Sequence, residues 1–277
     1  MLHSFKTWIK KHFAARMYRK ALAPSAREGL YKWLGLMAGK PPARLRDASY
    51  DIFTYHGEDG IIGFLLSRLS GVPPVFADIG SGDCIKSNCA YLAVHEGWKG
   101  CFLDTQAEQL EVGKKFYGAR GGKDNGIRFL QAYITPENVN GLLSGAGLNG
   151  EIGLLSIDID GNDFWIWKAI GVIRPRIVVI EAKVEFGIDN RVVPYAKSNH
   201  HSADKMYNGA SVEALKELGR QKGYKLAGAN KQGYNLFFVQ QHELIQEEQV
   251  VDILSDPEIR RSFYPPSFFM EHQFSKA

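Results

Sequence analysis

The sequence is poor in the features that characterise secreted, disulfide-bonded or membrane-spanning proteins. It has only three cysteines among 277 residues, Cys84, Cys89 and Cys101, and their spacing fits neither a disulfide framework nor a zinc site. No apolar run approaches the roughly 18 residues that cross a bilayer, and the N-terminus lacks the pattern of a secretory signal. These absences predict a cytoplasmic protein whose cysteines are small, buried apolar residues.

Acidic residues are absent from the first 27 positions, where basic residues alternate with apolar residues at helical spacing. A basic amphipathic helix of this kind has two interpretations. It contacts an anionic membrane surface through residues 1–28, or it packs against the rest of the protein or a second subunit. The basic residues are Lys6, Lys10, Lys11, Arg16, Arg19, Lys20 and Arg27.

The remaining composition is typical of a globular protein, with 45% apolar and 23% charged residues. The net charge of +4 is too small to indicate a nucleic-acid partner by itself. Pro41 and Pro42 end the helical N-terminal part, so we predict three parts: an extension over residues 1–45, a catalytic domain over 46–242 and a tail over 243–277.

Short apolar segments alternate with helical patterns after Pro74, which predicts an α/β fold with a mainly parallel, Rossmann-like sheet. The last two predicted strands, residues 225–229 and 235–239, have no helix between them and must therefore pair in antiparallel fashion. The other predicted strands are residues 75–79, 100–104, 127–131, 152–158 and 176–181. Helices are predicted over residues 88–96, 107–117, 135–144, 164–170 and 211–222.

A glycine-rich turn follows the first predicted strand, with Gly80 and Gly82 directly after Asp78. Glycine has no Cβ, so the backbone of such a turn can pass close to a ligand. About twenty residues later Asp104 ends the next strand, where a carboxylate can accept both hydroxyls of a ribose. The pattern predicts a pocket for a cofactor that contains adenosine.

The turn favours S-adenosylmethionine over a dinucleotide. It lacks the third glycine of the dehydrogenase fingerprint, and no Gly-Lys-Ser or Gly-Lys-Thr sequence follows as in a Walker loop. Asp78 and Asp83 flank the turn, and their negative charge suits the ammonium and sulfonium groups of S-adenosylmethionine better than a pyrophosphate.

Five segments of the sequence resemble the FkbM-like branch of the class I S-adenosylmethionine-dependent methyltransferases. The resemblance spans about residues 50–239 and implies O-methylation of a small molecule, most often a sugar hydroxyl. One departure is Asp104, where relatives often have a glutamate just after the strand. The segments are residues 55–62 (YHGEDGII), 77–83 (ADIGSGD), 87–88 (SN), 155–165 (LSIDIDGNDFW) and 178–181 (VVIE).

The cofactor residues follow from the pattern and the resemblance together. Asp78 and the glycines are expected around the methionine end of the cofactor, Asp104 on the ribose, and the residues after the third strand near the adenine. Tyr133 either stacks on the adenine or belongs to the core. The predicted set is Asp78, Gly80, Gly82, Asp83, Asn88, Asp104, Gln131, Ala132 and Tyr133.

The predicted catalytic residues are Asp158, Asp160 and Glu181. Residues i and i+2 of a strand share a face, and parallel strands end at one edge of the sheet, so the three carboxylates are expected to converge. They either bind Mg²⁺ or another divalent cation, or one of them acts as a general base; a purely structural role is the third reading. His200 and His201, in a predicted loop, are a further candidate for the base.

Two other functions remain open at this point. Methyltransferases that act on amino groups usually have an Asn/Asp-Pro-Pro-aromatic segment after the fourth strand, but here residues 160–163 read Asp-Gly-Asn-Asp. Such an acidic segment also disfavours a nucleic-acid substrate. The second alternative is a non-catalytic protein that binds S-adenosylmethionine without turnover.

Overall fold

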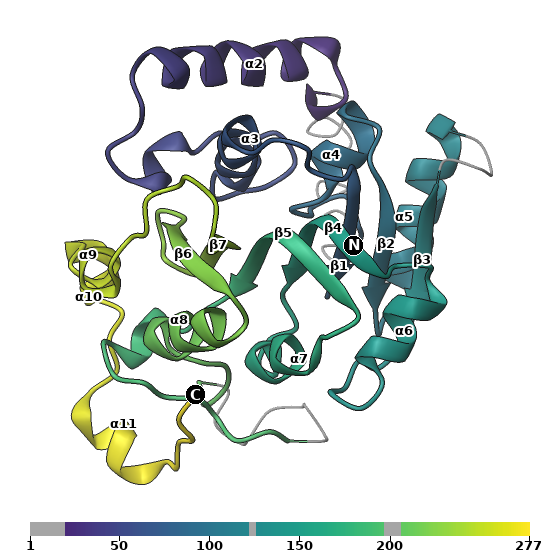
Figure 1. Ribbon diagram of the computed structural model, residues 1–277. Helices are drawn as coiled ribbons and strands as arrows, with labels where there is room; N and C mark the ends of the chain where they lie inside the picture. The colour runs from purple at the N-terminus through teal and green to yellow at the C-terminus, as the bar shows by residue number, and fades with distance from the viewer. Residues whose placement is uncertain (1–19, 122–125, 197–205) are drawn as a thin grey trace, which may run out of the picture.

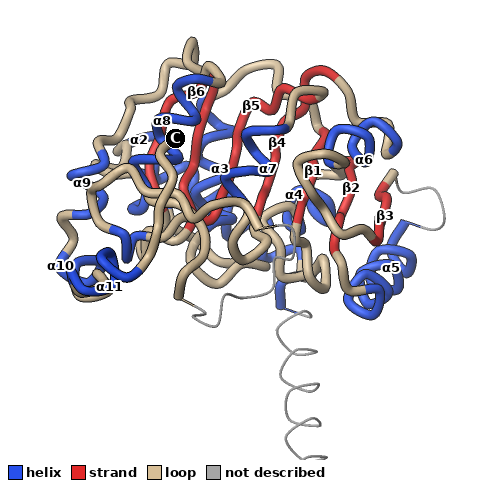
Figure 2. Tube along the Cα trace, turned by 90° about the horizontal axis from the view of Figure 1, so that it is seen from below, coloured by secondary structure: helices blue, strands red, loops and turns tan. Residues whose placement is uncertain are grey.

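The computed structural model describes residues 20–121, 126–196 and 206–277 (Figure 1). A seven-stranded sheet forms its centre, and helices lie on both faces of the sheet (Figure 2). The strands are β1 (Val75–Ile79), β2 (Lys99–Asp104), β3 (Ile127–Gln131), β4 (Gly150–Ile157), β5 (Ile173–Glu181), β6 (Tyr224–Ala229) and β7 (Asn235–Gln240).

The order of the strands is β3-β2-β1-β4-β5-β7-β6. Neighbours are parallel from β3 to β5, whereas β7 pairs antiparallel with both β5 and β6. Strands β2 and β3 lie on one side of β1, whereas β4 and β5 lie on the other. Open α/β sheets bind ligands at the point where the strand order changes side in this way. This topology confirms the predicted fold class, a mainly parallel sheet that ends in an antiparallel hairpin.

Ten α-helices and two 3₁₀ turns accompany the sheet in the described residues. They are α2 (Pro24–Gly39), α3 (Glu58–Arg68), α4 (Ala90–His95), α5 (Ala107–Gly121), α6 (Val139–Gly145), α7 (Asp163–Ala169), α8 (Val212–Gln221), α9 (Val250–Leu254), α10 (Pro257–Arg260), α11 (Pro266–Glu271) and the 3₁₀ turn Val184–Phe186. A further 3₁₀ turn covers Leu45–Ala48.

Alternating side chains of the strands supply two separate cores. Phe76, Phe102 and Val179 point to the face that α3, α4 and α5 cover. Their neighbours in the sequence point to the opposite face, where α6, α7 and α8 pack, and Trp167 of α7 is the largest side chain buried there. A sheet buried on both faces explains why its strands read as nearly continuous apolar runs.

The parts before and after the sheet pack against it. Helix α2 lies across α3, and its Arg27 pairs with Glu96 at 3.1 Å. Ile253 of α9 is fully buried in the core on the α8 side. Most of the predicted basic helix, residues 1–19, lies outside the described residues, and the division into three parts stays a prediction.

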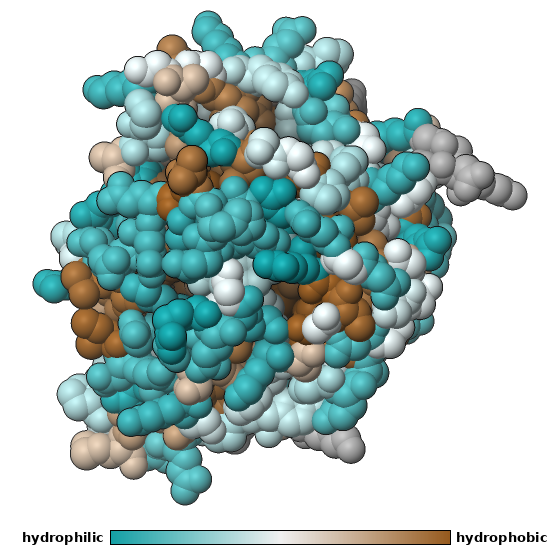
Figure 3. All heavy atoms as spheres, in the orientation of Figure 1, coloured by the Kyte–Doolittle hydropathy of each residue, from teal (hydrophilic) through white to brown (hydrophobic). Residues whose placement is uncertain are grey.

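The surface and the cysteines agree with the composition. Hydrophilic side chains cover most of the face drawn in Figure 3. Cys84, Cys89 and Cys101 are buried and unpaired, as predicted. Within the described residues, no helix combines the length and the apolar character needed to cross a membrane.

Candidate active site

The turn after β1, residues 80–83, is called the glycine loop below, and it is packed against the segment that follows β4. Gly80 has φ +87°, and a Cβ at this position would lie 1.7 Å from the main-chain oxygen of Asp158. Only glycine allows this approach. By contrast, nothing lies within 4 Å of a Cβ built on Gly82, so the space above that residue is open.

Asp104 at the end of β2 reaches back to the glycine loop. One of its carboxylate oxygens accepts the N–H of Gly82 at 2.8 Å, and the other accepts the N–H of Gln106 at 2.8 Å. The carboxylate is buried, with 7% of the residue exposed. Asp104, the residue predicted to bind the ribose, therefore lies beside the glycine loop.

Asp78, the last acid of β1, is also buried and accepts a short hydrogen bond from the Ser87 hydroxyl. Burial raises its pKa to about 6, against the opposing effect of the hydroxyl donors around it. Asn88 donates its amide to the Ser156 hydroxyl at 3.0 Å, which joins the segment before α4 to β4. The charge on Asp78 is thus held in a site that favours a cationic partner.

The other predicted cofactor residues lie farther from the strand ends of β1 and β4. One oxygen of Asp83 accepts the N–H groups of Ile85 and Lys86, each at 2.9 Å. Gln131 donates its amide to the Thr105 carbonyl at 3.3 Å, and the Ala132 N–H donates to the Asp104 carbonyl at 3.0 Å. Tyr133 is 39% exposed, and its carbonyl accepts the side-chain amide of Asn138 at 2.8 Å.

A cavity of about 150 Å³ opens between these elements. Its lining comes from the start of α3 and the segment before it, from β1 and the glycine loop, from the segment before α4, from the carboxyl end of β4 and from the first residue of β7. The residues are Thr54, Tyr55, His56, Glu58, Asp78, Gly80, Ser81, Lys86, Ser87, Asn88, Ser156, Asp158 and Asn235.

The segment before α3 is the part of this site to which the sequence reading assigned no role. Asp59 fixes it, because one carboxylate oxygen accepts the N–H groups of Ile52, Phe53 and Thr54 at 2.7–2.9 Å. Glu58 accepts the side-chain amides of two asparagines, at 2.8 and 2.9 Å. The Glu-Asp pair at a helix N-terminus was a visible signal, but it indicated only favourable helix-dipole charge.

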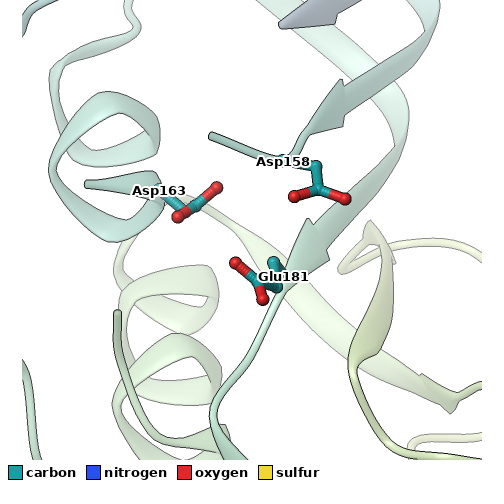
Figure 4. Close-up of side chains that lie close together, drawn as sticks. All are labelled: Asp158, Asp163 and Glu181. Carbon is teal, nitrogen blue, oxygen red and sulfur yellow. The ribbon is translucent and has the colours of Figure 1, made fainter. Parts of the chain in front are cut away.

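A second group of acids lies on the β4–β5 side of the cavity. Carboxylate oxygens of Asp158, Asp163 and Glu181 lie within 4.8 Å of one another (Figure 4), and these three residues are called the carboxylate cluster below. Asp158 follows β4, Asp163 opens α7, and Glu181 ends β5. The end of the sheet therefore brings together two of the three predicted catalytic residues.

Asp160 does not belong to this cluster, although the sequence placed it there. β4 ends at Ile157, and Asp160 has φ +56°, so the two-residue alternation of a strand does not extend to it. Asp163 takes its place. Its two oxygens accept the N–H groups of Ile159 and Gly161, at 2.8 and 2.9 Å, and this fold-back of the turn brings its carboxylate to the strand ends.

Mutual repulsion and burial raise the pKa values in the carboxylate cluster. The pKa of Asp158 rises to about 7, first through burial and then through the charges of Asp163, Asp160 and Asp78. Part of the Asp158 residue is exposed to solvent, although many protein atoms lie near its carboxylate. Burial and the neighbouring acids raise the pKa of Glu181 to about 8.

Lys183 is the counter-charge of the carboxylate cluster. Its ammonium group lies 3.2 Å from one oxygen of Glu181, while the other Glu181 oxygen is buried without a hydrogen-bond partner. A site with three acids, one lysine and an unpartnered oxygen can accept a proton or a further hydrogen-bond donor. His200 and His201 lie outside the described residues.

Comparisons with solved structures find methyltransferases of low sequence identity. No protein-family model matches the sequence, and no curated protein matches it. An O-methyltransferase family protein from Burkholderia thailandensis matches with a TM-score of 0.43 and 14% identity over 68% of this chain, which spans 60% of that protein. The O-methyltransferase from Bacillus cereus, solved with S-adenosylhomocysteine, gives 0.44 and 15% over 76% of this chain and 88% of that one. Magnesium protoporphyrin IX methyltransferase from Synechocystis PCC 6803, with bound S-adenosylmethionine, gives 0.42 and 9% over 66% and 77%.

Proposed function

We propose that the protein is an S-adenosylmethionine-dependent O-methyltransferase of the FkbM-like type that acts on a sugar hydroxyl. The supporting observation is the contact between Gly80 and the main chain of Asp158. It joins the glycine loop, where the sequence predicts the cofactor, to the carboxylate cluster at the same edge of the sheet. Donor and acceptor would therefore meet within one cleft, and their alignment is a large part of catalysis.

The residues around the glycine loop suit the proposed cofactor. Asp78 offers a buried negative charge for its ammonium group, Asp104 offers carboxylate oxygens for the ribose hydroxyls, and Gly82 leaves open space above the loop. When bound, the cofactor supplies a methyl group on a positively charged sulfur. The acidic surroundings favour that charge, whereas they would repel the pyrophosphate of a dinucleotide.

The carboxylate cluster suits activation of a hydroxyl acceptor. A general base works best when its pKa lies near the operating pH, and Asp158, at about 7, meets this condition. In the proposed step the Asp158 carboxylate takes the hydroxyl proton as the acceptor oxygen bonds to the methyl carbon. The bound cofactor would supply the methyl group, with its sulfur as the leaving group. The positive charge of Lys183 would offset the negative charge of Glu181 during this proton transfer.

The acidic lining also favours a neutral polyhydroxylated acceptor. Ionised carboxylates accept hydrogen bonds only, and sugar hydroxyls are donors to them. A phosphorylated substrate would meet like charge instead. This supports the carbohydrate acceptor that the sequence resemblance implied.

A divalent cation is the second candidate for the role of the carboxylate cluster. The close oxygens of Asp158, Asp163 and Glu181 are the ligand type that Mg²⁺ prefers. Such an ion would polarise the acceptor hydroxyl as a Lewis acid, and the unpartnered Glu181 oxygen is a suitable ligand. The proposed metal ligands are therefore Asp158, Asp163 and Glu181, with Asp163 in the place of Asp160.

Calorimetric titration tests the cofactor first. Native protein is expected to bind S-adenosylhomocysteine and not NAD. Transfer from S-adenosylmethionine with a labelled methyl group is then measured on a panel of neutral sugars and glycosides. Absence of S-adenosylhomocysteine binding would reject the proposal, and binding without transfer to any hydroxyl would favour the non-catalytic alternative.

Substitutions then test the chemistry. Asp158→Asn and Glu181→Gln are expected to retain cofactor affinity and to lose transfer by about 100-fold or more, the usual contribution of a general base. Asp160→Asn is the comparison variant: it removes a charge that raises the Asp158 pKa but leaves the proposed base in place, so transfer is expected to persist. Loss of transfer on EDTA treatment, with recovery on Mg²⁺ addition, would assign the cluster to the metal rather than to the base.

A further inference from the structure

Lys86 stands out in the cavity because its neighbours there are mostly acidic or neutral. Among the described residues that line the cavity, Lys86 is the only lysine or arginine, and the same lining includes Glu58, Asp78 and Asp158. The oxygens of Glu58 are already occupied by two asparagine amides and the His56 N–H, the last at 3.0 Å. No ion pair joins Lys86 to an acid in the part of the chain that the structure describes.

Two contacts place Lys86 between the glycine loop and Tyr55. Its main-chain N–H donates to Asp83 at 2.9 Å, which ties the residue to the glycine loop. Its ammonium group lies 5.2 Å from the centre of the Tyr55 ring, within the range of a cation–π contact. Tyr55 belongs to the segment before α3 that Asp59 holds in place. The charge is therefore presented at the rim of the cavity.

The cavity consequently has negative charge at Asp78 and positive charge at Lys86. This separation matches a zwitterion, which carries an ammonium and a carboxylate on one carbon. We propose that Lys86, held by Tyr55, binds the α-carboxylate of the cofactor's amino-acid part while Asp78 holds its α-ammonium group. This inference rests on the proposed function and extends it to a residue pair that determines specificity for an amino-acid end.

Three ligands separate this role from a general effect on the site. S-adenosylhomocysteine has the whole amino-acid end, decarboxylated S-adenosylmethionine lacks only the carboxylate, and 5′-methylthioadenosine lacks the amino-acid end entirely. Lys86→Met is expected to weaken S-adenosylhomocysteine binding about tenfold, the lower range for a hydrogen bond to a charged group at a partly exposed site. Affinity for the other two ligands is expected to stay unchanged.

Two variants serve as controls. Lys99→Met removes a lysine at the amino end of β2, the opposite edge of the sheet, and should leave all three affinities unchanged. Tyr55→Leu removes the ring under Lys86 and should reproduce part of the loss for S-adenosylhomocysteine alone, whereas Tyr55→Phe should retain native affinity.

The outcomes are distinct. Failure of the native protein to bind S-adenosylhomocysteine would reject the cofactor and this role of Lys86 with it. Native binding that Lys86→Met leaves unchanged would reject the role of Lys86 alone. An equal loss for S-adenosylhomocysteine and 5′-methylthioadenosine would show that Lys86 merely maintains the shape of the loop, which also overturns the inference.

Discussion

The acids on the two sides of the cleft differ in how their charge is stabilised. On the glycine-loop side, main-chain N–H groups donate to both oxygens of Asp104 and to one oxygen of Asp83, and a hydroxyl donates to Asp78. On the β4–β5 side, Asp158 and Glu181 lie close together, Lys183 pairs with Glu181, and the second Glu181 oxygen is buried without a partner.

This difference indicates that the two sides of the cleft have different functions. Charge that is held by fixed donors changes little when a ligand arrives, which suits binding of a cofactor. Charge that is crowded by like charge has a pKa near neutrality and can exchange a proton, which suits activation of an acceptor. Asp78 lies between the two, since it has a hydroxyl donor and yet a pKa of about 6.

The contact that links the two sides offers the strongest test of the comparison. Gly80→Ala would place a methyl group against the Asp158 carbonyl and force a left-handed alanine. Strain and overpacking together predict a loss of about 4 kcal/mol in the free energy of unfolding. Chemical denaturation measures the loss, and S-adenosylhomocysteine binding is expected to disappear with it.

Gly82→Ala is the control for this variant. It has a similar positive φ, +52°, but open space around the new Cβ. We expect a loss of only about 1 kcal/mol, the cost of a left-handed alanine. Equal losses for the two variants would mean that the contact with Asp158 does not matter.

Asp78→Asn tests the residue that lies between the two sides. The asparagine can still accept the Ser87 hydroxyl, but it carries no charge. We expect the cofactor-free protein to become more stable by about 3 kcal/mol at pH 8, from the rise of the Asp78 pKa from 3.8 to about 6 on folding. Affinity for S-adenosylhomocysteine should fall, because the partner of the ammonium group is lost.

The pH dependence gives the sign of this effect. Above pH 6 native Asp78 is ionised in a buried site, and that cost reduces the stability of the wild type. As the pH falls through 6 toward 4, the folded state binds the proton first and the cost disappears. The stability advantage of Asp78→Asn should therefore shrink toward pH 5 in parallel thermal melts. An advantage that grows at low pH would contradict the raised pKa.

The sheet and the glycine loop were predictable because their signals are local. The strands appear as short apolar runs, and the predicted bounds of β1 and β3 agree with the structure. Helices α9 to α11 were not predicted. They have only four to six residues each, and aromatic contacts such as that of Phe186 with Phe268 hold this part in place.

The carboxylate cluster was only partly predictable because its geometry depends on a turn. The prediction extends the strand alternation of β4 to Asp160, although the Asp-Gly pair at 160–161 is a turn signal. Asp160 has a positive φ in this turn, and main-chain N–H groups of the turn bind the Asp163 carboxylate. If the predicted strand ends before this pair, Asp163 at the start of α7 becomes the better candidate for the third carboxylate.

Asp104→Asn tests the glycine-loop side alone. The substitution keeps the size of the side chain but removes the charge that is predicted to bind the ribose hydroxyls. We expect S-adenosylhomocysteine affinity to fall about tenfold, with little change in transfer at saturating cofactor. Glu271→Gln, on exposed α11, is the control for loss of one negative charge. Unchanged affinity would limit Asp104 to its bonds with Gly82 and Gln106.

The smallest expected effect tests whether the C-terminal tail supports the β4–β5 side only. Ser275 and Val192 exchange two main-chain hydrogen bonds, at 2.7 and 2.9 Å, and the next residue, Val193, accepts the indole N–H of Trp165 in α7. Ser275→Pro removes one donor, and the loss of about 1 kcal/mol should speed hydrogen exchange of residues 187–196 about fivefold.

Ser275→Ala retains the main-chain donor and should exchange like the wild type, which separates the backbone bond from the serine hydroxyl. S-adenosylhomocysteine affinity should be native in both variants, because no contact of the tail reaches the glycine loop within the described residues. Weaker binding in Ser275→Pro would mean that the two sides of the cleft are coupled through the tail. Their different electrostatics would then belong to a single cooperative unit.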